Sequence, residues 1–352
     1  MKILYAIQAT GNGHISRAIE LLPYLKKHGN VDVFLSGSNS SLKMPFPVKY
    51  TSKGVSLFYG NTGGLNYIKM LQSFAPLRVI KEAMQLPVEN YDIVLNDFES
   101  ITSLACKLKK VASIQFGHQA SFVSANTPRP ENKDFIGEMV LKNYASSSVN
   151  IALHFQQYDN FIYSPVIKET ILQAEPINNG HITVYLSHYS DDVIKEQLFK
   201  VKDVHFHVFS KNVNSITMER NITFVPVSNI LFTRSLIESD GVITGAGFET
   251  PAEALYLRKM LMCLPINGQY EQLCNAEALK AFNVPIIDEI DNSFSFKIKQ
   301  WLNALPSKPL QLSNTTEQLI ETVIQKGIEI KSGKTNSPEP LIFQPNLVPS
   351  IV

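Results

Sequence analysis

The feature that most constrains the fold is a twice-repeated alternation of short apolar runs with amphipathic segments. Each apolar run is short enough for a buried parallel strand, and the segments between the runs have helical periodicity. Strands that alternate with helices form doubly wound α/β domains around a parallel sheet. The predicted strands are 2–8, 31–37, 48–52, 55–59, 91–97, 111–118 and 149–155, then 181–187, 204–210, 221–227, 241–244, 260–266 and 284–288.

A length of 352 residues with two such series predicts two Rossmann-like domains. The first domain is expected to span residues 1–165 and the second 166–330, and residues 331–352 are expected to form an extended tail. Ligands of open parallel sheets bind outside the carboxyl ends of the strands. We therefore expect the two sheets to face one another across a cleft.

The composition excludes several classes of protein. A net charge of +1 gives no basic footprint for nucleic acid. The three cysteines are isolated and lack zinc-ligand spacing, which favours a reduced, cytoplasmic setting. No run reaches the length of about 18 apolar residues that a membrane span needs. The first apolar run ends in a glycine loop and is interpreted as a strand, not a signal peptide.

The first candidate site follows the first predicted strand, in the sequence TGNGH. Gly11 and Gly13 place His14 at the start of a helix that faces the cleft, where an imidazole can act as a general base. Ser16 and Arg17 stand where a dinucleotide fingerprint needs small residues, so an NAD site is disfavoured. The alternative is a histidine that caps the helix or fills a structural position.

Asp97 ends the predicted strand 91–97 and precedes a helix. Polar groups at the carboxyl ends of parallel strands are often functional, so Asp97 is a candidate to orient His14 or to act as the base itself. Aspartate is also an ordinary helix N-cap, which is the alternative role.

The second candidate site begins with Gly245–Gly247, directly after the strand 241–244 and before a helix. Glycines at this position let backbone N–H groups approach an anion, and the helix N-terminus adds its positive dipole end. Glu253 lies one turn further along and is expected near the same ligand. Such a site suits a molecule that carries both phosphate and hydroxyl groups, for example a sugar nucleotide.

Other polar positions of the second domain support or limit this hypothesis. Ser187 and His188 lie in the first strand–helix turn and are candidates to hold a phosphate, although Ser190 can also cap the helix. His205 and His207 share a strand face but lack a third ligand, so structural roles are favoured over zinc. The chain contains no Asp-x-Asp, so a diphosphate would be held by backbone dipoles and side-chain donors instead of a metal.

The order of these motifs resembles that of the two-domain GT-B glycosyltransferases that use UDP-sugars, especially the bacterial lipid-linked N-acetylglucosaminyl transferase and its relatives. The glycine loop that ends in His14 matches the N-terminal motif. A glycine followed by Thr-x-x-Glu and an acidic residue followed by Gln match the C-terminal motifs. The residues concerned are Gly247, Thr250, Glu253, Glu271, Gln272, Asn275 and Ala276.

The resemblance implies a role for each matched position. Glu253 would hold the ribose, and Thr250 with the amides of the Gly245–Gly247 loop would hold the diphosphate. Glu271 and Gln272 would contact the sugar hydroxyls or phosphates, and backbone near Val227 would bind uracil. Glu249 stands where plant-type relatives carry asparagine. The implied nucleotide-sugar site comprises Gly11, Gly13, Ser187, His188, Val227, Gly245, Ala246, Gly247, Glu249, Thr250, Glu253, Glu271 and Gln272.

The activity so implied is metal-independent, inverting transfer of a hexose or N-acetylhexosamine from a UDP-sugar to a hydroxyl of a glycan, lipid-linked or small-molecule acceptor. His14 or Asp97 would be the base, and no cofactor is required. Such transfer belongs to cell-envelope or other glycan biosynthesis. Two alternatives stay open, namely a UDP-sugar 2-epimerase that uses Asp97 with Glu249 as acid and base, and a non-catalytic binder of sugar nucleotides or glycans.

The segment 63–84 of the first domain mixes apolar residues with Lys69, Arg78 and Lys81. In an enzyme with a lipid acceptor this segment would contact the inner face of the membrane peripherally. A core helix with a solvated basic edge is the favoured alternative.

Overall fold

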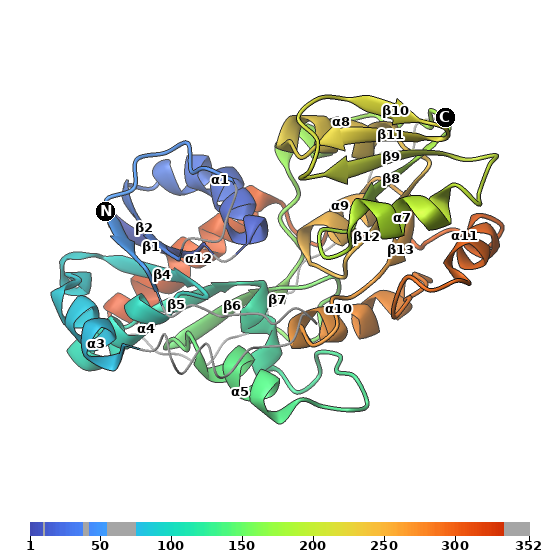
Figure 1. Ribbon diagram of the computed structural model, residues 1–352. Coiled ribbons are helices and arrows are strands. Elements are labelled where there is room, and N and C mark those ends of the chain that lie inside the picture. Colours follow the sequence, from blue (N-terminus) through green and yellow to red (C-terminus); the bar gives the residue numbers. More distant parts are fainter. Residues whose placement is uncertain (10, 38–41, 55–74, 334–352) are drawn as a thin grey trace, which may run out of the picture.

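The computed structural model describes residues 1–9, 11–37, 42–54 and 75–333. Figure 1 shows two lobes, each built from a sheet with helices on its faces. One sheet has seven strands and the other has six, and parallel pairing dominates both. The predicted pair of doubly wound α/β units is therefore confirmed.

The first sheet has the strand order β3-β2-β1-β4-β5-β6-β7, and all its pairs are parallel. Apolar β1 lies in the middle and is almost fully buried, as its sequence predicts. Ile7 near its end pairs with Asp97, the last residue of β4. The predicted strand 55–59 lies outside the described residues. The strands are β1 Lys2–Gln8, β2 Asn30–Ser36, β3 Tyr50–Ser52, β4 Ile93–Asp97, β5 Ile114–Gly117, β6 Val149–Leu153 and β7 Ile162–Tyr163.

Helices cover both faces of this sheet. The helix α3 begins with Pro76 in its first turn, because proline lacks the N–H that a helix interior needs and its fixed φ suits a helix start. Residues 63–74 of the segment 63–84 lie outside the described part. The helical elements are α1 Asn12–Lys26, α3 Pro76–Gln85, η1 Val88–Asn90, α4 Ser100–Lys109, η2 His118–Val123, α5 Phe135–Asn143 and α6 Glu169–Leu172.

The second sheet has the order β10-β11-β9-β8-β12-β13, with only β10 antiparallel to its neighbour among the described strands. Thr244 at the end of β12 pairs with Tyr185 of β8 and Cys263 of β13, so the carboxyl ends of these strands share one edge. The strands are β8 His181–Tyr185, β9 His205–Ser210, β10 Thr217–Glu219, β11 Ile222–Pro226, β12 Gly241–Thr244 and β13 Met260–Cys263. The helices are α7 Asp191–Leu198, α8 Asn229–Glu238, α9 Glu249–Tyr256, α10 Tyr270–Lys280, α11 Phe294–Leu302 and α12 Thr316–Lys331.

The prediction of a last strand at 284–288 is wrong. This segment forms only an isolated parallel bridge between Ile286 and Cys263. The Cys263 N–H donates to the Pro285 carbonyl, and the Ile287 N–H donates back to the Cys263 carbonyl. Pro285 has no N–H of its own, so it cannot extend the ladder.

The C-terminal helix α12 returns to the first sheet and packs against α1 and β4. Figure 1 shows it beside these elements. Gly327 lies so close to Ile93 that a Cβ at this position would have no room. Lys331 also forms an ion pair with Asp92. Residues 316–331 therefore pack on the first sheet, although the sequence-based boundary places them in the second domain. Of the tail expected at 331–352, residues 334–352 lie outside the described part.

A continuous apolar core joins the two lobes. One cluster of buried residues includes Phe155 after β6 together with Phe248 before α9. The rings of these two residues lie 5.1 Å apart, and the ring of His118 stacks on Phe248 at 3.9 Å. No helix in the described parts of the chain is both long and apolar enough to cross a membrane.

Candidate functional site

The residues predicted to be functional lie at the carboxyl edges of the two sheets. In the first sheet, β1 ends at Gln8, β4 ends at Asp97 and β5 ends at Gly117. In the second, β12 ends at Thr244, directly before the loop Gly245–Gly247. Contacts between side chains then connect one edge to the other.

The first glycine loop leads into α1. Gly11 has a φ of 116°, in the region that favours glycine, and precedes the first residue of the helix. Gly11, its N-cap residue, has no side chain to cap the helix. His14 lies in its first turn, and its Nδ1 is 2.9 Å from Asp97 Oδ1. His14 is therefore not a capping residue.

Asp97 is fully buried and faces α1. The N-cap of α4 is Glu99, whose carboxylate accepts hydrogen bonds from the N–H groups of Ile101 and Thr102. The alternative role of Asp97 as the cap of that helix is therefore excluded. Burial alone would raise the pKa of Asp97, but the charge of Arg17 and the hydrogen bond from His14 outweigh it and hold the pKa below the ordinary value.

The contact with Asp97 fixes the proton of the His14 ring. Arg17 Nη2 lies 3.0 Å from His14 Nδ1, but it donates to both Asp97 oxygens. An ionised carboxylate can only accept, so the contact between His14 Nδ1 and Asp97 Oδ1 places the ring hydrogen on Nδ1. The other nitrogen, Nε2, is then an acceptor. Gln119 Nε2 lies 3.5 Å from it, at the limit of a hydrogen bond. Nε2 is therefore the ring atom that can take a proton from another molecule.

Arg17 was not predicted as a site residue. Its Nη2 donates to both carboxylate oxygens of Asp97, at 2.7 and 2.9 Å, and its Nη1 forms an ion pair with Glu249 of the second lobe. Arg17 is only 4% exposed. The two carboxylates outweigh burial and raise the pKa of the guanidinium above its ordinary value. The sequence signal for Arg17 is its spacing from His14, since residues three apart share a helix face.

Two more pairs of side chains cross between the lobes. Gln119 Nε2 donates to Glu271 Oε2 at 3.0 Å, so the predicted residue Glu271 lies close to the environment of His14. His118 Nε2 is 2.8 Å from Asn275 Oδ1, and Asn275 Nδ2 donates to the Ala246 carbonyl at 3.1 Å. Sequence reasoning missed His118 and Gln119, which directly follow the strand β5.

Glu253 is enclosed rather than open. It is 2% exposed, and its two carboxylate oxygens lie 3.1 and 3.2 Å from Lys168 Nζ. Burial raises the pKa of Glu253, and Lys168 opposes that rise. Lys168 comes from the segment that links the lobes and was not predicted. Binding of a ribose by Glu253 stays a prediction, and a ribose there would share the carboxylate with Lys168.

The second glycine loop leaves space above its backbone. A Cβ added to Gly247 would have no described atom within 4 Å. The N-cap of α9 is Phe248, which has no side-chain oxygen, and no side chain caps the helix. Glu249 and Thr250 form the first turn and are half-buried. This arrangement presents helix N-terminal amides in the way that anion-binding sites do.

Gln272 holds the backbone of the neighbouring loop. Its side-chain oxygen accepts from the Ile266 N–H at 3.0 Å, and its Nε2 donates to Gln269 at 2.8 Å. The same oxygen would lie 3.3 Å from a Cβ on Gly245. Gln272 is thus placed beside the second glycine loop, with part of its hydrogen-bonding capacity already in use.

The remaining predicted residues follow strands at the same edge of the second sheet. Ser187 and His188 are exposed in the turn between β8 and α7, and Ser190 is the N-cap residue of α7 without a side-chain bond. Val227 follows β11, and its N–H donates to the Ser210 carbonyl at 3.3 Å.

The histidines of β9 have local partners. His205 Nε2 is 2.9 Å from Thr223 Oγ1, and His207 Nδ1 is 3.3 Å from Ser235 Oγ. Within the described ranges, no group of three or more His, Cys, Asp or Glu side chains is placed to hold a metal ion.

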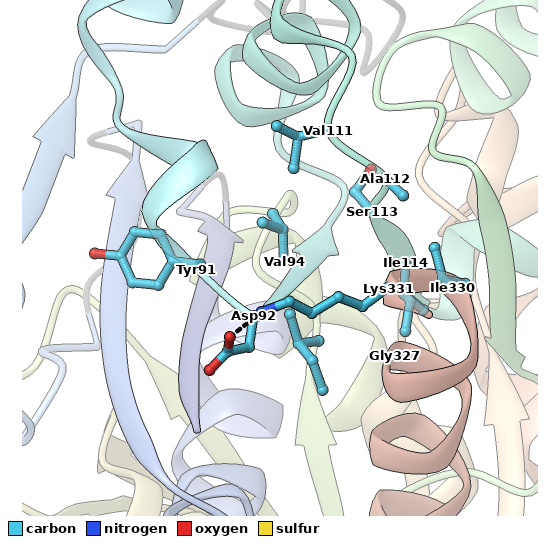
Figure 2. A pocket seen from close by; sticks show the side chains of 11 residues that line it. Tyr91, Asp92, Val94, Val111, Ala112, Ser113, Ile114, Gly327, Ile330 and Lys331 are labelled. Atoms are coloured by element: carbon cyan, nitrogen blue, oxygen red, sulfur yellow. Dashed lines mark hydrogen bonds and ion pairs between the residues drawn. The ribbon is translucent and has the colours of Figure 1, made fainter. Parts of the chain in front are cut away.

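A hollow at the opposite end of the first sheet is not the predicted site. Figure 2 shows it between α12 and the sheet, with Asp92 and Lys331 paired at its side. Its lining includes Ile93 and Ile114, the first residues of β4 and β5. It therefore lies at the amino ends of these strands, whereas Asp97 and Gly117 lie at their carboxyl ends, where ligands of such sheets bind.

The sequence profile described as glycosyl transferase family 1 matches residues 1–306. The chain belongs to this family and is therefore a glycosyltransferase. A comparison with proteins of curated function finds no match.

Solved structures share the fold at low sequence identity. Arabidopsis thaliana UGT89C1 complexed with UDP is 11% identical, with a TM-score of 0.53 over 95% of this chain and 94% of that one. Phytolacca americana UGT2 complexed with UDP-2fluoro-glucose and pterostilbene is 11% identical, with a TM-score of 0.57 over 95% of each chain. S. aureus MnaA with UDP is 11% identical, with a TM-score of 0.56 over 97% and 99%. The fold is thus the two-domain GT-B architecture.

Proposed function

We propose that this protein is a metal-independent, inverting glycosyltransferase that moves a hexose or N-acetylhexosamine from a UDP-sugar to an acceptor hydroxyl. The observation that carries the proposal is the pairing of His14 with the buried carboxylate of Asp97. Arg17 binds Asp97 and also Glu249, so it connects this pair to the start of α9. The proposed base, His14, and the proposed anion-binding N-terminus of α9 are therefore connected by one chain of side-chain contacts.

His14 is the proposed base and Asp97 its positioning residue. Asp97 holds the Nδ1–H, and Nε2 accepts the proton of the acceptor hydroxyl. The acceptor oxygen then attacks the anomeric carbon from the face opposite the diphosphate. The new C–O bond forms as the bond between the anomeric carbon and the diphosphate oxygen breaks. UDP departs, and the configuration at the anomeric carbon of the transferred sugar is inverted.

The departing diphosphate needs stabilisation in the transition state. The amides of Gly245, Ala246 and Gly247, with the uncapped first turn of α9 and Thr250, are the proposed donors. Gly13 of the first lobe lies beside the start of α9, since a Cβ there would be 2.6 Å from Glu249 Oε2, and Gly11 is proposed to border the same space. This is the basis for proposing that no metal takes part.

The proposed donor contacts follow the order of elements in the second lobe. Glu253 would bind the ribose, Glu271 and Gln272 the sugar or phosphates, and backbone at Val227 the uracil. Ser187 and His188 would lie near the phosphates. The UDP complexes of UGT89C1 and MnaA, and the complex of UGT2 with UDP-2fluoro-glucose and pterostilbene, support a UDP-sugar donor and a separate acceptor.

Transfer is favoured over 2-epimerisation by the surroundings of Asp97. An acid–base pair made of Asp97 and Glu249 requires one of the two to carry a proton. Arg17 lies between them and, with His14, lowers the pKa of Asp97. A protonated Asp97 is therefore costly, while an ionised Asp97 suits the orientation of His14.

The experiment is a thermal-shift screen of UDP-, GDP- and TDP-sugars, followed by an acceptor screen with the best donor in the presence of EDTA. A donor at 100 times its dissociation constant should add about 2.7 kcal/mol of stability. Product NMR should show inverted anomeric configuration. Turnover that stops in EDTA and returns with a divalent cation, or a product with retained configuration, would contradict the proposal.

A cytoplasmic location with peripheral contact at the membrane is also proposed. On α3, Leu77 and Met84 are 84% and 61% exposed, next to the cationic residues Arg78 and Lys81. Exposed apolar side chains beside positive charge suit an anionic lipid surface. Sedimentation with anionic vesicles should carry the wild type down and Leu77→Gln/Met84→Gln less, and equal sedimentation of both would refute the contact.

A further inference from the structure

One guanidinium neutralises two carboxylates that come from different lobes. Arg17 on α1 binds both oxygens of Asp97 through Nη2 and binds Glu249 through Nη1. Asp97 belongs to the edge of the first sheet, and Glu249 belongs to the first turn of α9 in the second lobe. The contact therefore lies between the proposed base and the proposed diphosphate site.

Glu249 occupies the place where the proposed diphosphate would meet the first lobe. It follows the loop Gly245–Gly247 and opens a helix that no side chain caps. A Cβ on Gly13 would lie 2.6 Å from Glu249 Oε2, so the carboxylate packs against the first glycine loop as well. A diphosphate bound there would have a carboxylate of the same sign as its neighbour, and such pairs repel.

The guanidinium of Arg17 has unused hydrogen-bonding capacity. Its Nε is buried and makes no hydrogen bond within the described residues. Buried donors are normally paired, and an unpaired one is a reason to expect a ligand. Guanidinium N–H groups bind phosphate oxygens as well as carboxylate oxygens, so the Nη1 that holds Glu249 can bind a phosphate in its place.

We propose that Arg17 binds the diphosphate of the donor from the first lobe, and that Glu249 takes the place of the phosphate when the donor is absent. Donor binding exchanges the Glu249 carboxylate for a phosphate oxygen on Nη1, while Nη2 stays on Asp97. The inference rests on the proposed function. According to this inference, the Arg17 guanidinium offsets the negative charge of the departing UDP, and it belongs to the same lobe as His14.

If phosphate replaces Glu249 on Arg17, substitutions of Glu249 and of Arg17 should change the affinity for UDP in opposite directions. Glu249→Gln removes the competing charge and keeps the Arg17–Asp97 contact, so it should bind UDP more tightly. Arg17→Gln removes the phosphate ligand, so it should bind UDP more weakly. Uridine, which lacks the diphosphate, should bind equally to the wild type and both variants.

The test is calorimetric titration of the wild type, Glu249→Gln and Arg17→Gln with UDP and with uridine. Glu249→Gln should raise UDP affinity about three- to tenfold, and Arg17→Gln should lower it at least about tenfold, the range expected for one charge-assisted contact. Glu317→Gln, which breaks the exposed ion pair with Lys27, is the matched control and should change neither affinity.

Two results would overturn the inference while the proposed function stands. One is UDP affinity in Glu249→Gln that is unchanged or lower, and the other is an equal change of UDP and uridine affinity in both variants. If Arg17→Gln does not fold, Glu249→Gln carries the test by itself. A wild type that binds neither UDP nor uridine overturns the proposed function, and this inference with it.

Discussion

Replacement of Asp97 by asparagine tests the proposed base most sharply without changing the shape of the site. The carboxylate is fully buried and accepts from His14 Nδ1 at 2.9 Å and from Arg17 Nη2 at 2.7 and 2.9 Å. An asparagine keeps one acceptor oxygen and presents N–H donors on the other side. One of the two partners therefore loses its acceptor.

The cost to stability follows from these contacts. Hydrogen bonds to a charged group contribute about 1.5–3 kcal/mol, and an unpaired buried charge costs about 3–5 kcal/mol. Arg17 keeps Glu249 as a counter-ion, so we expect Asp97→Asn to lose about 2–4 kcal/mol rather than to unfold.

The effect on turnover should be larger. Once Asp97 no longer fixes the hydrogen on His14 Nδ1, the ring can place it on Nε2, where it blocks proton uptake. General-base catalysis contributes about 10²–10⁴-fold, so transfer should fall by about that factor. The assay is release of UDP at saturating donor and acceptor, with circular dichroism to verify the fold.

Glu99→Gln is the matched control for Asp97→Asn. Glu99 is also a buried carboxylate beyond β4, but it caps α4 and has no hydrogen bond to His14 or Arg17. It should lose about 1 kcal/mol of stability, as caps do, and keep its turnover. If folded Asp97→Asn keeps more than about a tenth of wild-type turnover, the proposed role of the dyad is refuted.

Three further predictions concern the space above the second loop, the docking of α12 and the buried histidines. Gly247→Ala should change the free energy of unfolding by less than about 0.5 kcal/mol, because no described atom lies within 4 Å of the added methyl group. It should still weaken UDP binding at least about tenfold by titration calorimetry, and unchanged binding would exclude close approach of the diphosphate. Gly327→Ala should lose about 1–3 kcal/mol in urea unfolding, because the methyl group meets Ile93, and wild-type stability would contradict this packing. Burial, with the charges of His118 and Arg129, holds the pKa of His154 well below the ordinary value. The unfolded chain then binds more protons below pH of about 6.5, so stability should fall on acidification by up to about 1.4 kcal/mol per pH unit for this group. His154→Phe should flatten that slope in unfolding titrations between pH 5 and 8, and an unchanged slope would assign it to other groups.

Much of the fold could be predicted from the sequence, because apolar strands and amphipathic helices have distinct periods. The strand predicted at 284–288 failed because apolar content alone ignored Pro285, which cannot donate to a ladder. The return of α12 to the first sheet could not be predicted, since helical periodicity shows that one face is buried but not against which sheet.

The sequence predicted where most of the site residues lie in the fold, but not which side chains they contact. The ends of strands identified His14, Asp97 and the second glycine loop, because their place at the carboxyl edge follows from topology. Arg17 was set aside as a departure from another motif, although its spacing from His14 places both on one helix face. The pairing of Glu253 with Lys168 depends on how the link packs between the lobes, which local sequence does not specify.

The central claim is that His14 does the chemistry while the second lobe binds the donor. The most direct measurement is the turnover of His14→Ala set against its affinity for UDP. We predict a fall in turnover of at least about 100-fold with UDP affinity within about threefold of the wild type. Wild-type turnover in a correctly folded His14→Ala would contradict the account, because transfer would then proceed without the base that Asp97 orients.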